Sequence, residues 1–410
     1  MKYIKFLVIL MSLGLFINSA EGKENVDSGR NKKTNKKAKK QLAAGCQPAS
    51  AAVDLDINNV RARIMNGGDM WWDLVSTAQY EVPKTDEPPR KTSLFAGALW
   101  IGGFDQGGNL RAAAMTYRQQ QSNDFYPGPL DTTDASVSQE VCNNWDKIWK
   151  VNREDIEAIQ EGNTDNIPDD IMNWPSRGNV SKGQSRYLAP FKDVDGNGVY
   201  EPRKGDVPDI KGDQALWFIY NDKGNIHSET EAPAIGLEVQ SMAFAFRTND
   251  QRNNMTFYDH KVINRSTNRL DSVHFGQWVD PDLGFAFDDY VGCDTSRDLG
   301  ICYNGDPFDE GVNGYGQNPP SVGVDFFEGP TTRDGKTLGM EYFVYYDNDF
   351  SVTGNPEEAQ HYYNYLTGSW KDGQSVTCGG NGRGGNTECD YMFPGDPVEG
   401  IGWTEESTGN

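Results

Sequence analysis

The residues best suited to chemistry in this sequence form a short acidic loop that begins at Asp193. In the run DVDGNGVYE, residues 193–201, side-chain oxygens recur at every second position and Gly198 stands sixth. This alternation matches the first half of a Ca²⁺-binding loop, in which side-chain oxygens are followed by one backbone carbonyl. The ligands predicted in this way are Asp193, Asp195, Asn197 and Val199.

The second half of the loop departs from the helix-loop-helix type of calcium site. Lys204 occupies position twelve, where an EF-hand has a bidentate glutamate, and Pro190 excludes a helix interior just before the loop. The closing carboxylate would therefore be Glu201, Asp206 or a residue from elsewhere in the chain. We predict a calcium loop of another type, and the alternative is a metal-free turn rich in Asp and Asn.

A second acidic cluster directly follows an expected strand. It contains Asp280, Asp282, Asp288, Asp289 and Asp294. Three interpretations are open at this point. The carboxylates form a weaker second calcium site, or Asp280 and Asp289 serve as the paired carboxylates of a polysaccharide hydrolase, or the cluster is a solvated turn.

Familiar catalytic motifs are missing from the sequence. It contains no HExxH pair, nucleophile elbow, phosphate loop or dinucleotide fingerprint. His227 lies near Glu229 without the spacing of a metal-ligand pair, and His260 and His274 fall within expected strands. A structural or binding role is therefore favoured over an enzymatic one.

The six cysteines are an even number, and none of their spacings is that of a zinc site with two CxxC pairs. In an exported chain this count favours disulfide bonds. The expected pairs close two short loops and tie the N-terminal end to the body of the protein. They are Cys293 with Cys302, Cys378 with Cys389, and Cys46 with Cys142.

Alternating apolar and polar residues predict the strands that position these groups. The expected strands cover residues 94–101, 215–220, 240–247, 255–264, 273–279 and 341–346. Gly and Asn at 105–109, 221–225 and 333–336 predict hairpin loops. Helical spacing is clear only from Trp145 to Ile159, where Asn152 and Asp155 would cap a second segment, and a shorter turn follows at 168–172.

We therefore expect a mainly β fold of antiparallel, sandwich-like sheets, with long ordered loops and a small helical insertion around residues 145–173. Aromatic residues gather at two places, and core packing is the expected role for them. Binding of sugars or protein partners is the alternative. These residues are Trp71, Trp72, Tyr362, Tyr363, Tyr365 and Trp370.

The first residues have the three parts of an export signal: Lys2 and Lys5, an apolar run from Phe6 to Ile17, and small residues up to Gly22. We assign residues 1–22 to a cleaved signal peptide and 23–45 to a basic flexible linker. Residues 46–410 would form the β-rich, calcium-binding region, as one domain or two closely packed lobes. No later apolar run is long enough to span a membrane, so we expect a secreted or outer-surface protein.

The charge of the chain is strongly acidic, with 60 Asp and Glu against 38 Lys and Arg and a formal net charge of −22. Nucleic acid is thereby excluded as a partner, because neutralising phosphates requires a basic surface. The partners that remain are surface proteins or glycans. The oligomeric state stays open.

Several motifs together resemble the N-terminal region of large exported proteins of Bacteroidota that carry a type 9 secretion sorting domain. They include NNVRARI at 58–64, GGDMWWD at 67–73, FAGALWIGG at 95–103 and the segment from Asp280 to Asp294. The resemblance implies export across both membranes to the cell surface or the medium. It assigns no activity to particular residues. Since relatives continue into a sorting domain beyond Trp403, we expect a fragment or a short member held at the surface by partners.

Taken together, these observations predict a calcium-stabilised, disulfide-bonded component of a surface assembly, with a structural or binding role. The alternative is a secreted hydrolase that acts on polysaccharide.

Overall fold

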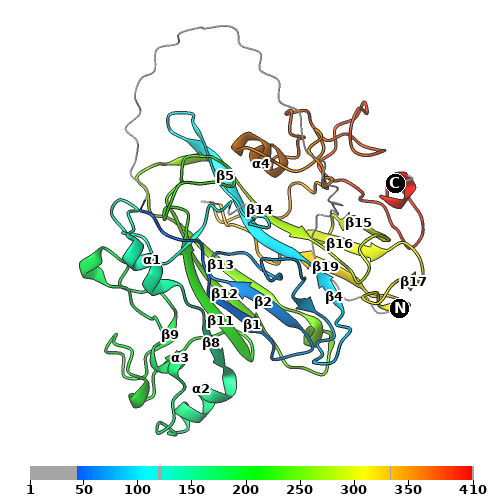
Figure 1. The fold of residues 1–410 in the computed structure, drawn as a ribbon. Helices are drawn as coiled ribbons and strands as arrows, with labels where there is room; N and C mark the ends of the chain where they lie inside the picture. The colour runs from blue at the N-terminus through cyan, green and yellow to red at the C-terminus, as the bar shows by residue number, and fades with distance from the viewer. Residues whose placement is uncertain (1–43, 119–121, 333, 409–410) are drawn as a thin grey trace, which may run out of the picture.

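The computed structural model describes residues 44–118, 122–332 and 334–408 (Figure 1). The predicted signal peptide and nearly all of the predicted linker lie outside these residues. As expected, the fold is mainly β, and the named strands pair in antiparallel sheets. Among the described residues, no helix is both long and apolar enough to cross a membrane.

The first layer of the fold is built from two neighbouring groups of strands, which a backbone bridge between Met70 and Gly97 connects. One group runs in the order β1 (Ala52–Leu55), β2 (Arg61–Met65), β3 (Tyr80–Glu81) and β4 (Thr92–Leu94). The other runs in the order β14 (Leu270–Asp280), β5 (Ala96–Asp105) and β6 (Leu110–Ala113).

The second layer is a five-stranded sheet with β11 at its centre. Its order is β13 (Phe257–Asn264), β12 (Leu237–Ala245), β11 (Gln214–Asn221) and β7 (Tyr126–Pro127), and β8 (Trp149–Asn152) also pairs with β11. All eight residues of β11 are buried, because both of its faces are covered. Phe218 and Tyr220 pack into the core shared with the first layer, whereas Trp217 and Ile219 pack into a second core beneath the helical insertion.

The helical insertion, expected around residues 145–173, begins earlier in the chain and contains a strand. Its helices are α1 (Gln139–Trp145), α2 (Arg153–Gln160) and α3 (Asp169–Met172). The expected helix from Trp145 to Ile159 is wrong in its first half, where β8 pairs with β11 and sets Trp149 opposite Trp217. Trp149 and Val151 are buried at a spacing of two, so sheet pairing there outweighs the helical spacing.

The rest of the chain forms smaller elements around these layers. β15 (Asp289–Asp294), β16 (Leu299–Asn304) and β19 (Ser321–Asp325) make a three-stranded sheet. Two-stranded pairs join β9 (Phe191–Lys192) to β10 (Val207–Pro208) and β17 (Phe308–Asp309) to β18 (Gly316–Gln317). Short 3₁₀ helices cover Val180–Lys182, Pro202–Lys204, Gln251–Asn254 and Glu406–Thr408.

Helix α4 (Ala359–Leu366) lies on the first layer, where two glycines make room for it (Figure 1). A Cβ atom on Gly276 would lie 2.5 Å from Leu366 Cδ2, and one on Gly102 would lie 2.9 Å from the Tyr363 ring. Side chains at these two strand positions would therefore push the helix off the sheet. The six aromatic residues singled out in the sequence are all buried, as core packing predicts.

The expected strand at 341–346 is wrong. Only Phe343 makes an isolated bridge, to Tyr391, and the segment does not join β14. Phe343 and Tyr346 are nevertheless buried, so the apolar pattern reflects side-chain burial without strand pairing.

Two of the three expected disulfides are confirmed, Cys46 with Cys142 and Cys378 with Cys389. The third is wrong, because Cys293 and Cys302 are free, buried thiols. In the register of β15 and β16, Cys302 stands opposite Val291 while Cys293 stands opposite Gly300. This diagonal placement sets the two sulfur atoms too far apart for a bond. Burial also raises the pKa of the Cys293 thiol to about 12.

Candidate functional site

The first predicted calcium loop lies between β9 and β10 and is organised by two aspartates. Asp193 accepts hydrogen bonds from the backbone N–H groups of Gly196 (2.8 Å) and Gly198 (2.6 Å). Asp206 is buried and accepts from the N–H groups of Val194 (2.9 Å) and Glu201 (2.7 Å). Asp206 thus holds both ends of the loop, which is the position expected of a closing carboxylate.

The other predicted ligands in this loop bind one another. The Asn197 amide donates to Asp195 Oδ2 (2.8 Å) and to Glu201 Oε2 (2.7 Å), and its oxygen accepts from the Val199 N–H (2.6 Å). Lys204 forms an ion pair with Glu201 at 2.7 Å. Together with Asn197, Lys204 lowers the pKa of Glu201. In this conformation the loop is an Asx-rich turn, and a cation would have to displace these donors.

The second acidic cluster has a different membership from the one predicted. Asp282, Asp288 and Asp289 remain together, in the turn before β15 and at its start, and Asp309 and Glu310 of the β17 region join them. Asp280 is bonded instead to the Tyr117 hydroxyl, which donates to Oδ2 at 2.7 Å. Asp294 lies at the far end of β15, where it accepts a hydrogen bond from Ser296 and pairs with Arg297.

The carboxyl groups of this cluster are shifted towards their neutral forms. Burial raises the pKa of Asp289 to about 9, and the nearby charges of Asp288, Asp282 and Asp309 add to the shift. The pKa of Asp288 rises to about 6 through burial and through contact with the Glu310 carboxyl group. Burial alone raises the pKa of Asp282 to about 6. Without a cation, Asp289 would therefore carry a proton at neutral pH.

Several oxygen atoms at this place are buried and make no hydrogen bond of ordinary geometry. They are both carboxylate oxygens of Asp288, Oδ1 of Asp289 and the amide oxygen of Asn304. Asn304 stands directly opposite Asp289 in the pairing of β15 with β16. In the part of the chain that the structure describes, no lysine, arginine or histidine forms an ion pair with Asp288 or Asp289.

A group of buried acceptors with too few donors is unfavourable unless a proton or a cation completes it. Oxygen ligands of this kind suit a hard divalent cation such as Ca²⁺. Within the described residues, however, no three His, Cys, Asp or Glu side chains are placed to hold a metal ion together. A cation here would depend on the amide oxygen of Asn304 and on small movements of the carboxyl groups. We call Asp282, Asp288, Asp289, Asn304, Asp309 and Glu310 the acidic centre.

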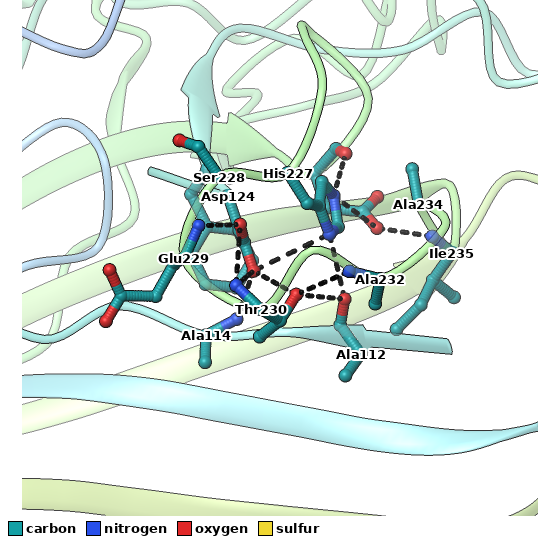
Figure 2. A network of polar contacts seen from close by, with 12 residues as sticks. Ala112, Ala114, Asp124, His227, Ser228, Glu229, Thr230, Ala232, Ala234 and Ile235 are labelled. Carbon is teal, nitrogen blue, oxygen red and sulfur yellow. Dashed lines mark hydrogen bonds and ion pairs between the residues drawn. The ribbon is translucent and has the colours of Figure 1, made fainter. Parts of the chain in front are cut away.

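The one fully buried histidine serves a structural purpose (Figure 2). His227 Nδ1 lies 2.8 Å from the carbonyl oxygen of Ala112, and Nε2 lies 2.6 Å from that of Asp222. Because a carbonyl can only accept, both ring nitrogens must carry hydrogen, and the ring is a cation. No nitrogen is left to take up a proton or to bind a metal.

Two buried carboxyl groups lie beside this imidazolium, and burial raises the pKa of one of them, Asp124, against the opposing effect of His227. Oδ2 of Asp124 lies 3.5 Å from Nδ1, and Oδ2 of Asp222 lies 3.6 Å from Nε2. Burial works against the charge, but these carboxylates and the two carbonyl groups outweigh it and raise the pKa of His227. Asp124 also accepts from the Thr230 hydroxyl at 2.7 Å (Figure 2). Sequence reasoning missed this network, because its members are far apart in the chain.

The two carboxylates of the hydrolase interpretation are buried. Asp280 and Asp289 are 4% and 9% exposed, and neither lines the two cavities that open beside β14 and the 341–346 segment. A glycosidase needs its pair to face a sugar across an accessible cleft.

Comparison of the chain with models of known protein families, with curated proteins and with solved structures found no match. The chemistry of its own residues therefore carries the functional argument.

Proposed function

We propose that this protein is an exported, calcium-stabilised and disulfide-bonded component of a surface assembly, with a binding or structural role. The observation that carries the proposal is the set of buried carboxylate and amide oxygens around Asp289, several of which make no hydrogen bond of ordinary geometry. Export would bring the protein to a compartment where both features are stable, since calcium is abundant outside cells and disulfides persist in oxidising compartments. The resemblance to type 9 cargo proteins of Bacteroidota supports the same destination.

In the acidic centre, a calcium ion would replace the proton that Asp289 otherwise holds. Asp288, Asp289 and Glu310 would supply carboxylate oxygens and Asn304 an amide oxygen, all of them hard ligands. The ion would thereby relieve the repulsion that raises the pKa of Asp289. It would also join β15, β16 and the β17 region, which are otherwise held by short pairings.

The exposed loop at 193–206 is the second calcium site in this proposal. There a cation would take the place of the Lys204 ammonium beside Glu201 and gather the remaining oxygens. The ligands would be Asp193, Asp195, Asn197, Val199, Glu201 and Asp206. Because most of these groups are exposed and already hydrogen-bonded, we expect weaker binding here than at the acidic centre.

Calorimetric unfolding with calcium and with a chelator tests the proposal. Calcium at one hundred times its dissociation constant would stabilise the folded state by about 2.7 kcal/mol per site. Asp288→Asn should remove the larger part of the calcium-dependent shift in Tm, and Asp193→Asn the smaller part. Glu399→Gln, which changes an exposed carboxylate outside both sites, serves as the control. Equal Tm values of the unaltered protein in chelator and in calcium would refute both sites.

A further inference from the structure

A narrow cavity lies between β14 and the extended segment 341–346. Its volume is about 160 Å³, and aromatic side chains make up much of its wall. They include Trp100, Trp278, Phe326, Tyr342, Phe343 and Tyr346. We call this cavity the aromatic slot. Its volume is close to the roughly 150 Å³ of an apolar cavity that accommodates benzene.

Two contacts mark the ends of the aromatic slot. At one end the Trp278 indole N–H donates to the Tyr346 hydroxyl at 2.9 Å. At the other, His274 Nδ1 lies 3.8 Å from Glu341 Oε2. The rings of Trp100 and Trp278 stack at 6.1 Å between centroids, with planes only 6° apart. The slot is therefore present in the protein without a ligand.

A wider, acidic hollow adjoins the slot and shares residues 338–342 with it. Its volume is about 530 Å³, and three carboxylates and one ammonium line it. These are Asp298, Glu341, Asp390 and Lys336. Among the described residues, neither Asp298 nor Asp390 is in an ion pair, so the hollow favours a cation.

Two backbone edges beside the aromatic slot are available for pairing. β14 pairs with β5 on one side, and no described strand pairs with its other side. The 341–346 segment pairs through Phe343 with Asp390 and Met392, and none of its other residues is in a strand pairing of the described chain. An extended peptide is the ligand that uses such edges, because its own N–H and C=O groups can pair with them.

We propose that the slot and the hollow together bind an extended peptide of a protein partner, through one bulky apolar side chain flanked by lysine or arginine. The apolar side chain fills the aromatic slot, and the flanking cations face Glu341 and Asp390. An acidic peptide would be repelled by the same carboxylates. The site lies apart from both calcium sites, so the inference holds or fails independently of them.

Three capped peptides with the cores Lys-Phe-Lys, Glu-Phe-Glu and Lys-Ser-Lys test this on the unaltered protein. Binding is followed by tryptophan fluorescence, to which Trp100 and Trp278 contribute, and by calorimetry. We expect saturable binding of Lys-Phe-Lys that weakens as salt rises, and at least tenfold weaker binding of the other two. Absence of Lys-Phe-Lys binding in the millimolar range, or equal binding of Glu-Phe-Glu, would overturn the proposal.

Variants locate the bound peptide. Glu341→Gln combined with Asp390→Asn should weaken Lys-Phe-Lys binding about tenfold, which corresponds to about 1.4 kcal/mol. Leu338→Trp, at the junction of slot and hollow, should abolish binding by filling the slot. Glu399→Gln should change nothing. A Tm within error of the unaltered protein establishes that each variant is folded, and undiminished binding by a folded Leu338→Trp variant would place the peptide elsewhere.

Discussion

Removing the buried imidazolium of His227 should destabilise the protein more than any other histidine change. In His227→Gln the amide replaces some of the donors to the carbonyl groups of Ala112 and Asp222, but the positive charge is lost. The carboxylates of Asp124 and Asp222, each now about 3.5 Å from the ring, would face a neutral group. The buried negative charges would then be uncompensated.

The size of the effect follows from complete burial. Side chains of His227, Asp124 and Asp222 are 0% exposed, so solvent cannot screen the loss. Breaking a buried ion pair by removing one partner costs about 3–5 kcal/mol. Since folded domains are stable by only about 5–15 kcal/mol, this is a large share of the total.

The pH dependence of the free energy of unfolding tests the charge of His227 more directly. The folded-state pKa of His227 lies above its ordinary value of 6.5. Its contribution to stability is therefore complete below pH 6.5 and disappears as the pH rises through the folded-state pKa. Urea unfolding between pH 6 and 9 should show the unaltered protein losing stability in this window. His227→Gln should lack that component of the decline.

A matched control is His361→Gln. This histidine lies 3.6 Å from the exposed Glu358, and the loss of such a surface pair costs at most about 1 kcal/mol. A loss of less than about 1 kcal/mol for His227→Gln would refute the charged, structural role. An unchanged pH profile would refute it equally.

Three further predictions concern the cysteines and the acidic centre. Replacing Cys46 and Cys142 by serine should lower the free energy of unfolding, measured in urea, by about 4–5 kcal/mol, because the disulfide closes a loop with a sequence separation of 96. A loss under about 1 kcal/mol would contradict this prediction. Ellman's reagent should not react with the folded protein, since Cys293 and Cys302 are both buried. After unfolding it should label both thiols. Rapid labelling of the folded protein would contradict their burial. In chelator, the free energy of unfolding should fall as the pH rises from about 4 to 9, because the pKa of Asp289 is raised to about 9. Asp289→Asn should flatten that decline and be more stable than the unaltered protein at pH 8. A steeper decline in the variant would contradict this prediction.

The central strands were predictable from the sequence, whereas the helical insertion was predictable only in part. Residues 215–220 are a strand as alternation predicts, but β11 is buried on both faces and not on one, because a second core forms beneath the helical insertion. At Trp149 the local spacing favours helix, but pairing with Trp217 decides the outcome. The segment 341–346 shows the converse, since its apolar residues reach the core without a strand partner.

The acidic centre was only partly predictable, because strand pairing brings some of its residues together from distant parts of the sequence. Asp282, Asp288 and Asp289 lie close together in the sequence, so their grouping could be predicted directly. Glu310 comes from the β17 region, and Asn304 comes from pairing of β15 with β16. No local pattern indicates either residue. The same strand register separates Cys293 from Cys302, although their spacing in the sequence had suggested a disulfide between them.

The bond between Cys46 and Cys142 has a mechanical consequence. If the chain is tethered through its N-terminal end, tension that enters at Cys46 passes directly through the sulfur atoms to Cys142. Residues 47–141, which include β1 to β6, then carry no load. Pulling at the N-terminal end therefore cannot peel β1 to β6 away one after another, whereas β14, the remaining strand of the first layer, lies outside the closed loop.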